Sequence, residues 1–189
     1  GVSPSIPVVA YDNAGGFSAG RLVWMLRMLG HPASLLNGGL PAWPGPLSTE
    51  EKLPEPTHCP TRPWPTALLA TMDQVADHDG PIVDARGHDR FRGDHEPLDT
   101  QPGHIPGATS SPFAQNLLDG YFHSPEKLRA AFNAHGISNA QSVISSCGSG
   151  VTACHNLLAM EHAGLGRGRL FVGSWSAWSR SDRPVATGE

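Results

Sequence analysis

The sequence predicts an α/β fold in which a parallel β-sheet is covered by helices on both faces. Two observations lead to this prediction. Short apolar segments alternate along the chain with longer segments that have helical periodicity and end at glycines. The apolar segments, such as residues 81–85, are continuous, as is typical of strands that are buried on both faces. With 189 residues, 39% of them apolar, the chain is long enough to bury such a core.

Local signals justify each element in turn. A helix is expected where a capping residue precedes it, as Ser124 does with Pro125 at the first helical position. Strands are expected at the short apolar segments between helices. In chain order the sequence predicts a strand at residues 8–11, a helix at 17–29, a strand at 33–36, a helix opened by a capping box at 71–74, a strand at 81–85, a helix at 124–135, a strand at 142–146, a helix at 150–163 and a strand at 170–172.

Eight prolines between Pro41 and Pro65 divide the chain. Proline removes a backbone donor and restricts the residue before it, so no regular element is expected at that density. We therefore interpret residues 46–65 as an extended linker between residues 1–45 and residues 66–189.

The two parts contain an internal repeat with an offset of 135 residues. Asp12 lies 31 residues before Trp43, and Cys147 lies 31 residues before Trp178, with the same order of strand, loop, helix, strand, Gly and Trp. Such repetition indicates two copies of one domain, although two unrelated units could share this spacing by chance. Residues 1–45 are expected to be the rear half of a second domain.

A half-domain of this kind is expected to need a partner. Its two strands would leave an unpaired parallel edge, and the apolar face of its helix would lie partly open. That face consists of Leu22, Val23, Leu26 and Leu29. We expect a separate N-terminal fragment of the same protein to cover it.

Composition and charge argue against several classes of function. The 13 basic and 17 acidic residues give a net charge of −4, which does not favour nucleic acid or an anionic membrane as a partner. No apolar stretch approaches the ~18 residues needed to cross a bilayer. The three cysteines, Cys59, Cys147 and Cys154, cannot all pair, so a cytoplasmic location is expected.

The segment Ser-Ser-Cys-Gly-Ser-Gly-Val-Thr-Ala-Cys at 145–154 places Cys147 between a buried strand and a helix. Ligands of open α/β sheets bind at this end of the strands. Backbone N–H groups of a Gly-rich turn can surround an anion, and such a field favours the thiolate, the nucleophilic form. Gly148 and Gly150 permit positive φ and let an anion approach the backbone closely. We predict that Cys147 is a nucleophile rather than a small core residue.

The other cysteines carry weaker signals. Cys154 lies one helical turn beyond Cys147 and is expected to pack in the core, and Cys59 lies in the linker. A zinc site formed by Cys147, Cys154, His155 and His162 has suitable residue types but lacks paired ligand spacing. No metal and no cofactor are therefore predicted.

Four segments together resemble the rhodanese family. The loop Cys-Gly-Ser-Gly-Val-Thr-Ala at 147–153 looks like its active-site loop, in the form found in 3-mercaptopyruvate sulfurtransferases. The other three are Val-Asp-Ala-Arg at 83–86 with Arg-Phe-Arg-Gly at 90–93, Gly-His-Ile-Pro-Gly-Ala at 103–108, and Gly-Ser-Trp-Ser-Ala-Trp at 173–178 with Pro-Val-Ala-Thr-Gly at 184–188. The resemblance covers about 66–189 in full and 1–45 as the rear of an N-terminal domain.

The resemblance implies a tandem-domain sulfurtransferase in which residues 66–189 are catalytic. Cys147 would take sulfur from 3-mercaptopyruvate as a persulfide and pass it to a thiol, to cyanide or to a thioredoxin-like reductant. Ser149 would help to move a proton as pyruvate leaves, and Arg90 would bind the carboxylate of the donor. The backbone groups that would stabilise the charge of the sulfur belong to Gly148, Gly150, Val151 and Thr152.

Other motif residues are expected to be structural. Arg86 is expected to form a salt bridge, Asp84 and His104 to be structural motif residues, and Trp175 and Trp178 to lie in the core. Asp12 takes the position of Cys147 in the first copy. A carboxylate cannot carry a persulfide, so the first copy is expected to be a scaffold.

The chain departs from the family pattern in two places. Mercaptopyruvate enzymes of animals have an arginine after a Glu-Pro pair, whereas Leu98 follows Glu96-Pro97 here. One carboxylate-binding group is therefore missing or supplied from elsewhere. The proton-relay aspartate of the family would lie in the front half of the N-terminal domain, outside residues 1–45.

Three rival interpretations remain. A thiosulfate sulfurtransferase typically has an arginine and a lysine after the cysteine, where Gly148 and Ser149 are neutral. A rhodanese-like phosphatase needs a Cys-x5-Arg motif, and Ala153 stands at the arginine position. A non-catalytic rhodanese-like binding module usually lacks the cysteine.

Overall fold

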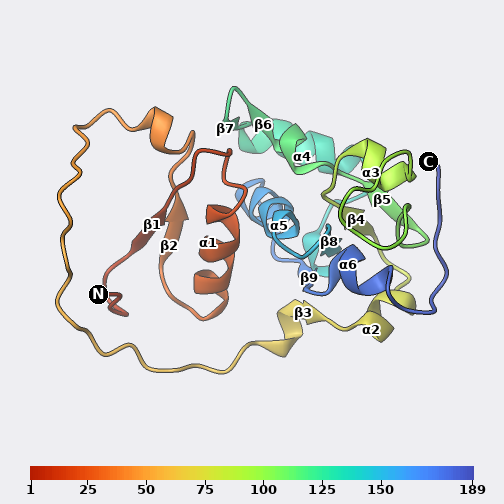
Figure 1. The fold of residues 1–189 in the computed structure, drawn as a ribbon, viewed down its shortest axis with the longest axis horizontal. Helices are drawn as coiled ribbons and strands as arrows, with labels where there is room; N and C mark the ends of the chain where they lie inside the picture. The colour runs from red at the N-terminus through yellow and green to blue at the C-terminus, as the bar shows by residue number, and fades with distance from the viewer.

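A five-stranded parallel sheet organises the C-terminal part of the computed structural model, which describes residues 1–189 (Figure 1). The strand order is β3-β9-β8-β4-β5, and every neighbouring pair is parallel. The predicted parallel sheet is therefore confirmed. The strands are β3 (Leu69–Ala70), β4 (Ile82–Asp84), β5 (Ala108–Ser110), β8 (Ile144–Ser146) and β9 (Arg169–Phe171).

Helices cover both faces of this sheet. Successive strand residues point to opposite faces, so each face packs against its own set of helices. Val83 packs against Leu128 of helix α4 (Pro125–Ala134) and Met160 of helix α5 (Thr152–His162). The neighbouring residue Ile82 instead belongs to a cluster that contains Val75 of α2 (Met72–Ala76) and Trp175 of α6 (Ser174–Trp178). The predicted arrangement of helices on both faces is thus observed.

The helix-start signals act as predicted. Thr71 Oγ1 accepts a hydrogen bond from the Gln74 N–H at 3.2 Å, and Gln74 Oε1 accepts one from the Thr71 N–H at 3.0 Å. This reciprocal pair is the capping box that opens α2. At α4 the cap runs one way: Ser124 Oγ accepts a hydrogen bond from the Lys127 N–H at 3.4 Å, with Pro125 at the first helical position.

The shortest elements were not predicted, since two to five residues carry too little periodicity to be recognised. They include helix α3 (His88–Arg92), the antiparallel pair β6 (Leu117–Leu118) and β7 (Tyr121–Phe122), and helix α6. Four 3₁₀ turns were also not predicted: η1 (Leu40–Ala42), η2 (Thr66–Leu68), η3 (Phe113–Asn116) and η4 (Ala140–Ser142).

The N-terminal part is a small unit of β1 (Val8–Ala10), α1 (Ala19–Met28) and β2 (Ala33–Leu35). Its two strands pair in parallel, and α1 packs against α5 (Figure 1). Val23 is fully buried in this contact, whereas Leu26 and Leu29 are half-buried, so the apolar face is partly open, as expected. Leu22 does point outward, with 48% of its surface exposed.

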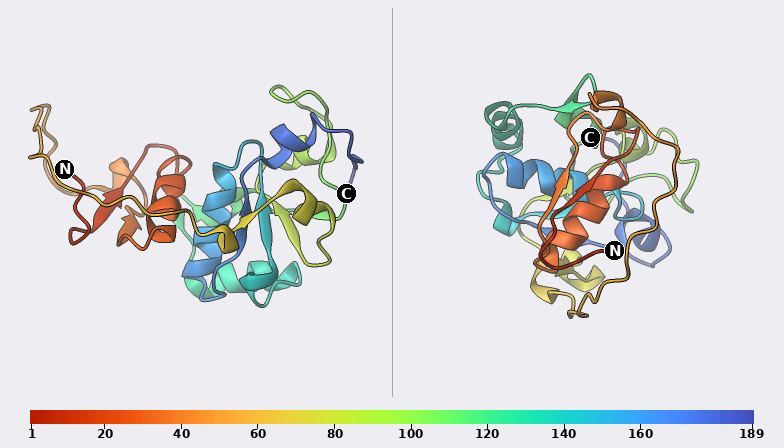
Figure 2. Two further views of the ribbon diagram at one scale, coloured as in Figure 1. Left: turned by 90° about the horizontal axis from the view of Figure 1, so that it is seen from below. Right: turned by 90° about the vertical axis from the view of Figure 1, so that its left-hand side faces the viewer.

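The proline-rich residues 46–65 form no helix or strand. They run around the outside of the β1–β2 unit and reach the sheet at β3 (Figures 1 and 2). Arg62 holds the linker to α1 by a 2.7 Å hydrogen bond from Nη1 to the Leu29 carbonyl. None of the helices is long and apolar enough to cross a membrane.

Two backbone features recur in both parts at the 135-residue offset. The carbonyl of Asp12 accepts a hydrogen bond from the Leu40 N–H, and the carbonyl of Cys147 accepts one from the Trp175 N–H. Gly39 has a φ of 63°, and Ser174, at the same offset, has a φ of 49°. A left-handed residue therefore turns the chain back onto the strand-to-helix loop in each part.

Candidate active site

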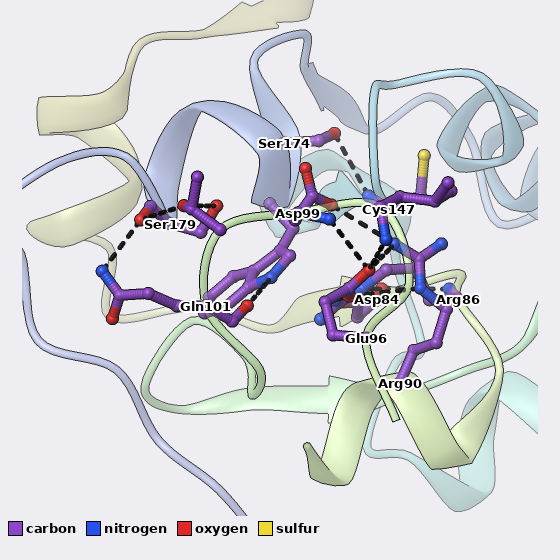
Figure 3. A network of polar contacts seen from close by, with 12 residues as sticks. Asp84, Arg86, Arg90, Glu96, Asp99, Gln101, Cys147, Ser174 and Ser179 are labelled. Carbon is purple, nitrogen blue, oxygen red and sulfur yellow. Dashed lines mark hydrogen bonds and ion pairs between the residues drawn. The ribbon is translucent and has the colours of Figure 1, made fainter. Parts of the chain in front are cut away.

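Cys147 lies at the carboxyl end of β8, immediately before α5, and only 2% of it is exposed. Its N–H donates to Ser174 Oγ at 3.1 Å, and its carbonyl accepts from the Trp175 N–H at 2.9 Å (Figure 3). The Ser174 hydroxyl in turn donates to the Phe171 carbonyl at 2.8 Å. The start of α6 thus fixes the backbone of the nucleophile candidate.

The loop presents backbone donors to the sulfur. The Gly150 N–H donates to Cys147 Sγ at 3.1 Å. Four further N–H groups of the loop have no acceptor within the protein: those of Gly148, Ser149, Val151 and Thr152. Because these donors surround the N-terminus of α5, the loop can stabilise negative charge on sulfur.

The two loop glycines have different roles. Gly150 has a φ of 75°, and a Cβ there would lie 2.8 Å from the Val172 carbonyl oxygen. Gly148 is not at positive φ. Its lack of a side chain instead leaves space beside Arg90, since a Cβ would already lie 3.7 Å from both terminal nitrogens of Arg90.

A cavity of about 340 Å³ opens beside Cys147. It brings together most of the predicted site residues: Arg90, Cys147, Gly148, Ser149, Val151 and Thr152. Gly150 does not line the cavity and acts through its N–H on the sulfur. The Ser149 hydroxyl has no partner within the protein, so it is free to contact a ligand. A larger cavity of about 450 Å³ elsewhere is not lined by a cysteine.

A buried ion-pair network lies next to the cavity (Figure 3). Arg86 pairs with Asp84 at 2.7 Å and with Glu96 at 3.2 Å, and it donates to the Gly103 carbonyl at 2.8 Å. Its guanidinium also lies 4.9 Å from the centre of the Trp175 ring. The expected structural salt bridge of Arg86 is confirmed.

Arg90 extends the same network to the cavity. Its Nη2 pairs with Glu96 at 2.6 Å and with Asp99 at 3.2 Å. Burial raises the pKa of Glu96, but hydrogen bonds from Arg90 and from backbone N–H groups outweigh it and leave that pKa below its ordinary value. Arg90 Nη1 has no partner within the protein, and the side chain is 20% exposed. Part of the guanidinium is therefore free to bind an anion.

The expected structural roles of the remaining motif residues are observed. His104 stacks on Phe91 with ring centres 3.8 Å apart, and its Nδ1 lies 2.8 Å from the Phe91 carbonyl. Trp175 and Trp178 are 0% and 2% exposed. Cys154 is buried, and burial raises the pKa of its thiol to about 12, so it packs as a neutral side chain.

Sequence reasoning missed the contributions of the β1–β2 unit. Arg21 of α1 donates from Nη1 to the carbonyl of Ser149 at 3.1 Å. Phe17 lines the cavity, with its ring 5.7 Å from that of Phe113. Both contacts depend on how α1 docks on α5, for which the sequence carries no local signal.

His155 joins the two parts from within the core. Burial lowers its pKa to about 4, because the charged imidazolium would lose its hydration there. The neutral ring places Nε2 3.0 Å from the Gly15 carbonyl and Nδ1 3.2 Å from Asn116 Nδ2. No group of His, Cys, Asp or Glu side chains that could hold a metal ion is formed.

Asp12 occupies the loop of the first copy. Its carboxylate accepts hydrogen bonds of 2.8–2.9 Å from four backbone N–H groups, those of Ala14, Gly16, Ser18 and Ala19. Burial alone would raise the pKa of Asp12. The four hydrogen bonds together outweigh burial, so the pKa lies below its ordinary value of 3.8.

A parallel α/β sheet with a cysteine in an N–H-lined loop at its carboxyl edge defines a class of domain built for an anionic cysteine centre. The chain belongs to the rhodanese family, because the model of the rhodanese-like domain matches residues 65–181.

Named relatives agree with this assignment. The chain is 40% identical to a Pseudomonas aeruginosa protein named as a probable 3-mercaptopyruvate sulfurtransferase, over 100% of this chain and 70% of that protein. It is 37% identical to the thiosulfate sulfurtransferase of Cricetulus griseus, over 97% of this chain and 66% of that protein. The solved 3-mercaptopyruvate sulfurtransferase from Leishmania major superposes with a TM-score of 0.79 at 36% identity, over 96% of this chain and 53% of that one. The predicted family is confirmed, and the relatives belong to the predicted class of enzyme, sulfurtransferases.

Proposed function

We propose that the chain is a sulfurtransferase that takes sulfur from 3-mercaptopyruvate as a persulfide on Cys147 and passes it to a thiol or to cyanide. One observation carries the proposal: the Gly150 N–H lies 3.1 Å from Cys147 Sγ, among loop N–H groups that have no other acceptor. Such a loop stabilises a charged sulfur, and its unpaired N–H groups are available to bind the second sulfur of a persulfide.

In the first half-reaction the Cys147 thiolate attacks the sulfur of the donor. An S–S bond forms while the C–S bond breaks, and the electron pair of that bond stays on carbon as the enolate of pyruvate. The enolate takes one proton and leaves as pyruvate. Ser149, whose hydroxyl lines the cavity without a protein partner, is placed to pass that proton, and Arg90 Nη1 to bind the carboxylate.

In the second half-reaction the acceptor thiolate attacks the outer sulfur of the persulfide. The bond between the two sulfurs breaks, its electron pair returns to Cys147 as thiolate, and the acceptor leaves with the sulfur. A thioredoxin-like protein offers a suitable thiolate, and cyanide would leave as thiocyanate. The cycle is redox-balanced and needs no cofactor.

The donor is assigned from the charge of the loop. Thiosulfate is a dianion without a carboxylate and suits a loop with two cations, whereas Gly148 and Ser149 are neutral. Thiosulfate remains the second candidate, because relatives of both names have similar identity to the chain. We expect kcat/KM to be at least roughly tenfold higher with 3-mercaptopyruvate than with thiosulfate, which corresponds to about 1.4 kcal/mol.

We also propose that residues 1–45 are the rear half of an inactive N-terminal domain, joined by linker 46–65 to the catalytic domain 66–189. The shared offset of Asp12 and Cys147 supports this organisation. Val9 and Tyr11, 57% and 56% exposed, leave β1 open to a partner, for which a separate N-terminal fragment of the same protein is suited.

The proposed function is tested by assaying thiocyanate formation from 3-mercaptopyruvate and cyanide. We expect Cys147→Ser to abolish the reaction, because serine is a far weaker nucleophile towards sulfur. Cys59→Ser is the matched control, since Cys59 is exposed in the linker, and it should retain full activity. Full activity of Cys147→Ser would contradict the proposal and favour a non-catalytic module.

A further inference from the structure

The charges around the Cys147 cavity do not balance. The network beside it contains two guanidiniums, of Arg86 and Arg90, and three carboxylates, of Asp84, Glu96 and Asp99. It therefore has one negative charge in excess. A donor that carries a carboxylate, next to a cysteine that must itself become negative, needs a further positive charge at the cavity.

Arg180 is the guanidinium at this cavity that has no ion-pair partner. It follows α6, is exposed, lines the same cavity as Cys147 and Arg90, and makes no hydrogen bond or salt bridge within the protein. Its charge is therefore not used by the fold. With Arg180 included, the charges lining and supporting the cavity sum to zero before a substrate binds.

The backbone next to Arg180 is fixed to the loop that carries Leu98. The Ser179 carbonyl accepts hydrogen bonds of 2.9 Å from Thr100 Oγ1 and from Gln101 Nε2 (Figure 3). Ser179 is 1% exposed, and Leu98, 74% exposed, lines the cavity as well. These two bonds hold the backbone before position 180 beside the segment that carries Leu98.

We propose that Arg180 binds the carboxylate of the sulfur donor and supplies the positive charge that Leu98 cannot provide. This inference rests on the proposed function and names a specificity-determining residue for it. The planar guanidinium of Arg180 can donate two parallel hydrogen bonds to a carboxylate. Arg90, whose Nη1 has no partner within the protein, can donate a further one. The site would thereby select sulfur donors that carry a carboxylate.

The test compares a charged donor with a neutral one. Mercaptoacetone keeps the ketone and the thiol of 3-mercaptopyruvate but has a methyl group in place of the carboxylate. For Arg180→Gln we expect kcat/KM with 3-mercaptopyruvate to fall at least about tenfold, mainly through KM, as the loss of a charge-assisted hydrogen bond predicts. With mercaptoacetone it should change less than about twofold.

Two further variants separate a role in binding from a general effect. Leu98→Arg added to Arg180→Gln should restore most of the loss with 3-mercaptopyruvate, because it returns a cation to the same side of the cavity. Arg167→Gln is the matched control: Arg167 is an exposed arginine that pairs with Glu161 and does not line the cavity. It should leave both donors unaffected.

The dissociation constant of 3-hydroxypyruvate, measured by calorimetry, tests the role of Arg180 without sulfur transfer. This analogue keeps the carboxylate but has no sulfur to transfer. A dissociation constant at least about tenfold higher for Arg180→Gln than for the wild type is expected. An unchanged dissociation constant, or equal losses with both sulfur donors, would overturn the role of Arg180. A wild type that binds the analogue through Arg180 but transfers sulfur from neither donor would contradict the proposed function alone.

Discussion

The loops that follow β1 and β8 share one backbone framework but hold different anions. Each follows a strand of a parallel pair, precedes a helix, and has its first carbonyl bonded by an N–H 28 residues further on, Leu40 for Asp12 and Trp175 for Cys147. In the first loop four N–H groups bind the carboxylate of Asp12. In the second, the Gly150 N–H alone contacts the sulfur of Cys147.

The difference shows how one side chain separates a scaffold from a reactive centre. Asp12 fills its loop with a permanent internal charge, so the helix N-terminus of α1 is satisfied by the fold itself. Cys147 is smaller and leaves donors without an acceptor, so its loop can bind charge that arrives with a substrate. The same field that stabilises structure in one loop is available for chemistry in the other.

The largest effect is expected when the second loop is given the side chain of the first. Cys147→Asp should lower sulfur transfer by about a thousandfold or more, because the nucleophile is lost and a carboxylate takes the loop donors. The protein should stay folded, as shown by an unchanged far-UV spectrum and cooperative urea unfolding. Appreciable transfer by this variant would break the comparison, since it would locate the chemistry at another residue.

A smaller effect is expected when the first loop loses its carboxylate. Asp12→Ala leaves four backbone donors at the start of α1 without their acceptor, so the free energy of unfolding should fall by about 1 kcal/mol, as for the loss of a helix cap. Urea unfolding at neutral pH measures the change. Activity per folded molecule should be retained, because Asp12 does not line the Cys147 cavity.

The pH dependence of this stability difference follows from the lowered pKa of Asp12. The carboxylate stabilises the fold fully above its ordinary pKa of 3.8, and this contribution is lost as the pH falls through the lower pKa of the folded state. The difference in the free energy of unfolding between wild type and Asp12→Ala should therefore be constant near neutral pH and become smaller in acid. A difference that widens below pH 3.8 would show that the N–H groups do not hold an ionised carboxylate.

The smallest effect concerns the contact between the two parts. Arg21 donates to the carbonyl of Ser149 from outside the cavity, so it acts as a positioning residue for the loop. Arg21→Gln should lower kcat about threefold with little change in KM, and Arg21→Lys should recover part of the loss. Arg27→Gln on the same helix is the control: it loses a pair with Glu161 at 3.5 Å and a 2.7 Å hydrogen bond to the Ala33 carbonyl, but no contact with the Cys147 loop, and should leave kcat unchanged. A change confined to KM would place Arg21 among the substrate contacts instead.

The sheet, the principal helices and the nucleophile loop could be predicted because their signals are local. A continuous apolar strand, a glycine-rich turn and a helix cap are each written in adjacent residues, as at residues 142–154. Arg21, Phe17 and Arg180 could not be predicted as site residues, because they reach Cys147 only through the docking of α1 on α5 and the fold of the segment after α6. Glycine permits a positive φ at both loop positions, and only the fold determines that the turn has it at Gly150 and not at Gly148.

The most direct measurement is to locate sulfur on the chain after brief incubation with 3-mercaptopyruvate. Persulfides are alkylated, the protein is digested, and the cysteine peptides are read by mass spectrometry. Fragmentation of the peptide that holds both Cys147 and Cys154 locates the sulfur within it. One extra sulfur atom on Cys147, absent from Cys154 and Cys59 and removed by cyanide, is the result that the loop geometry predicts. An unmodified Cys147, in a sample that nevertheless produces pyruvate, would contradict a persulfide at this cysteine.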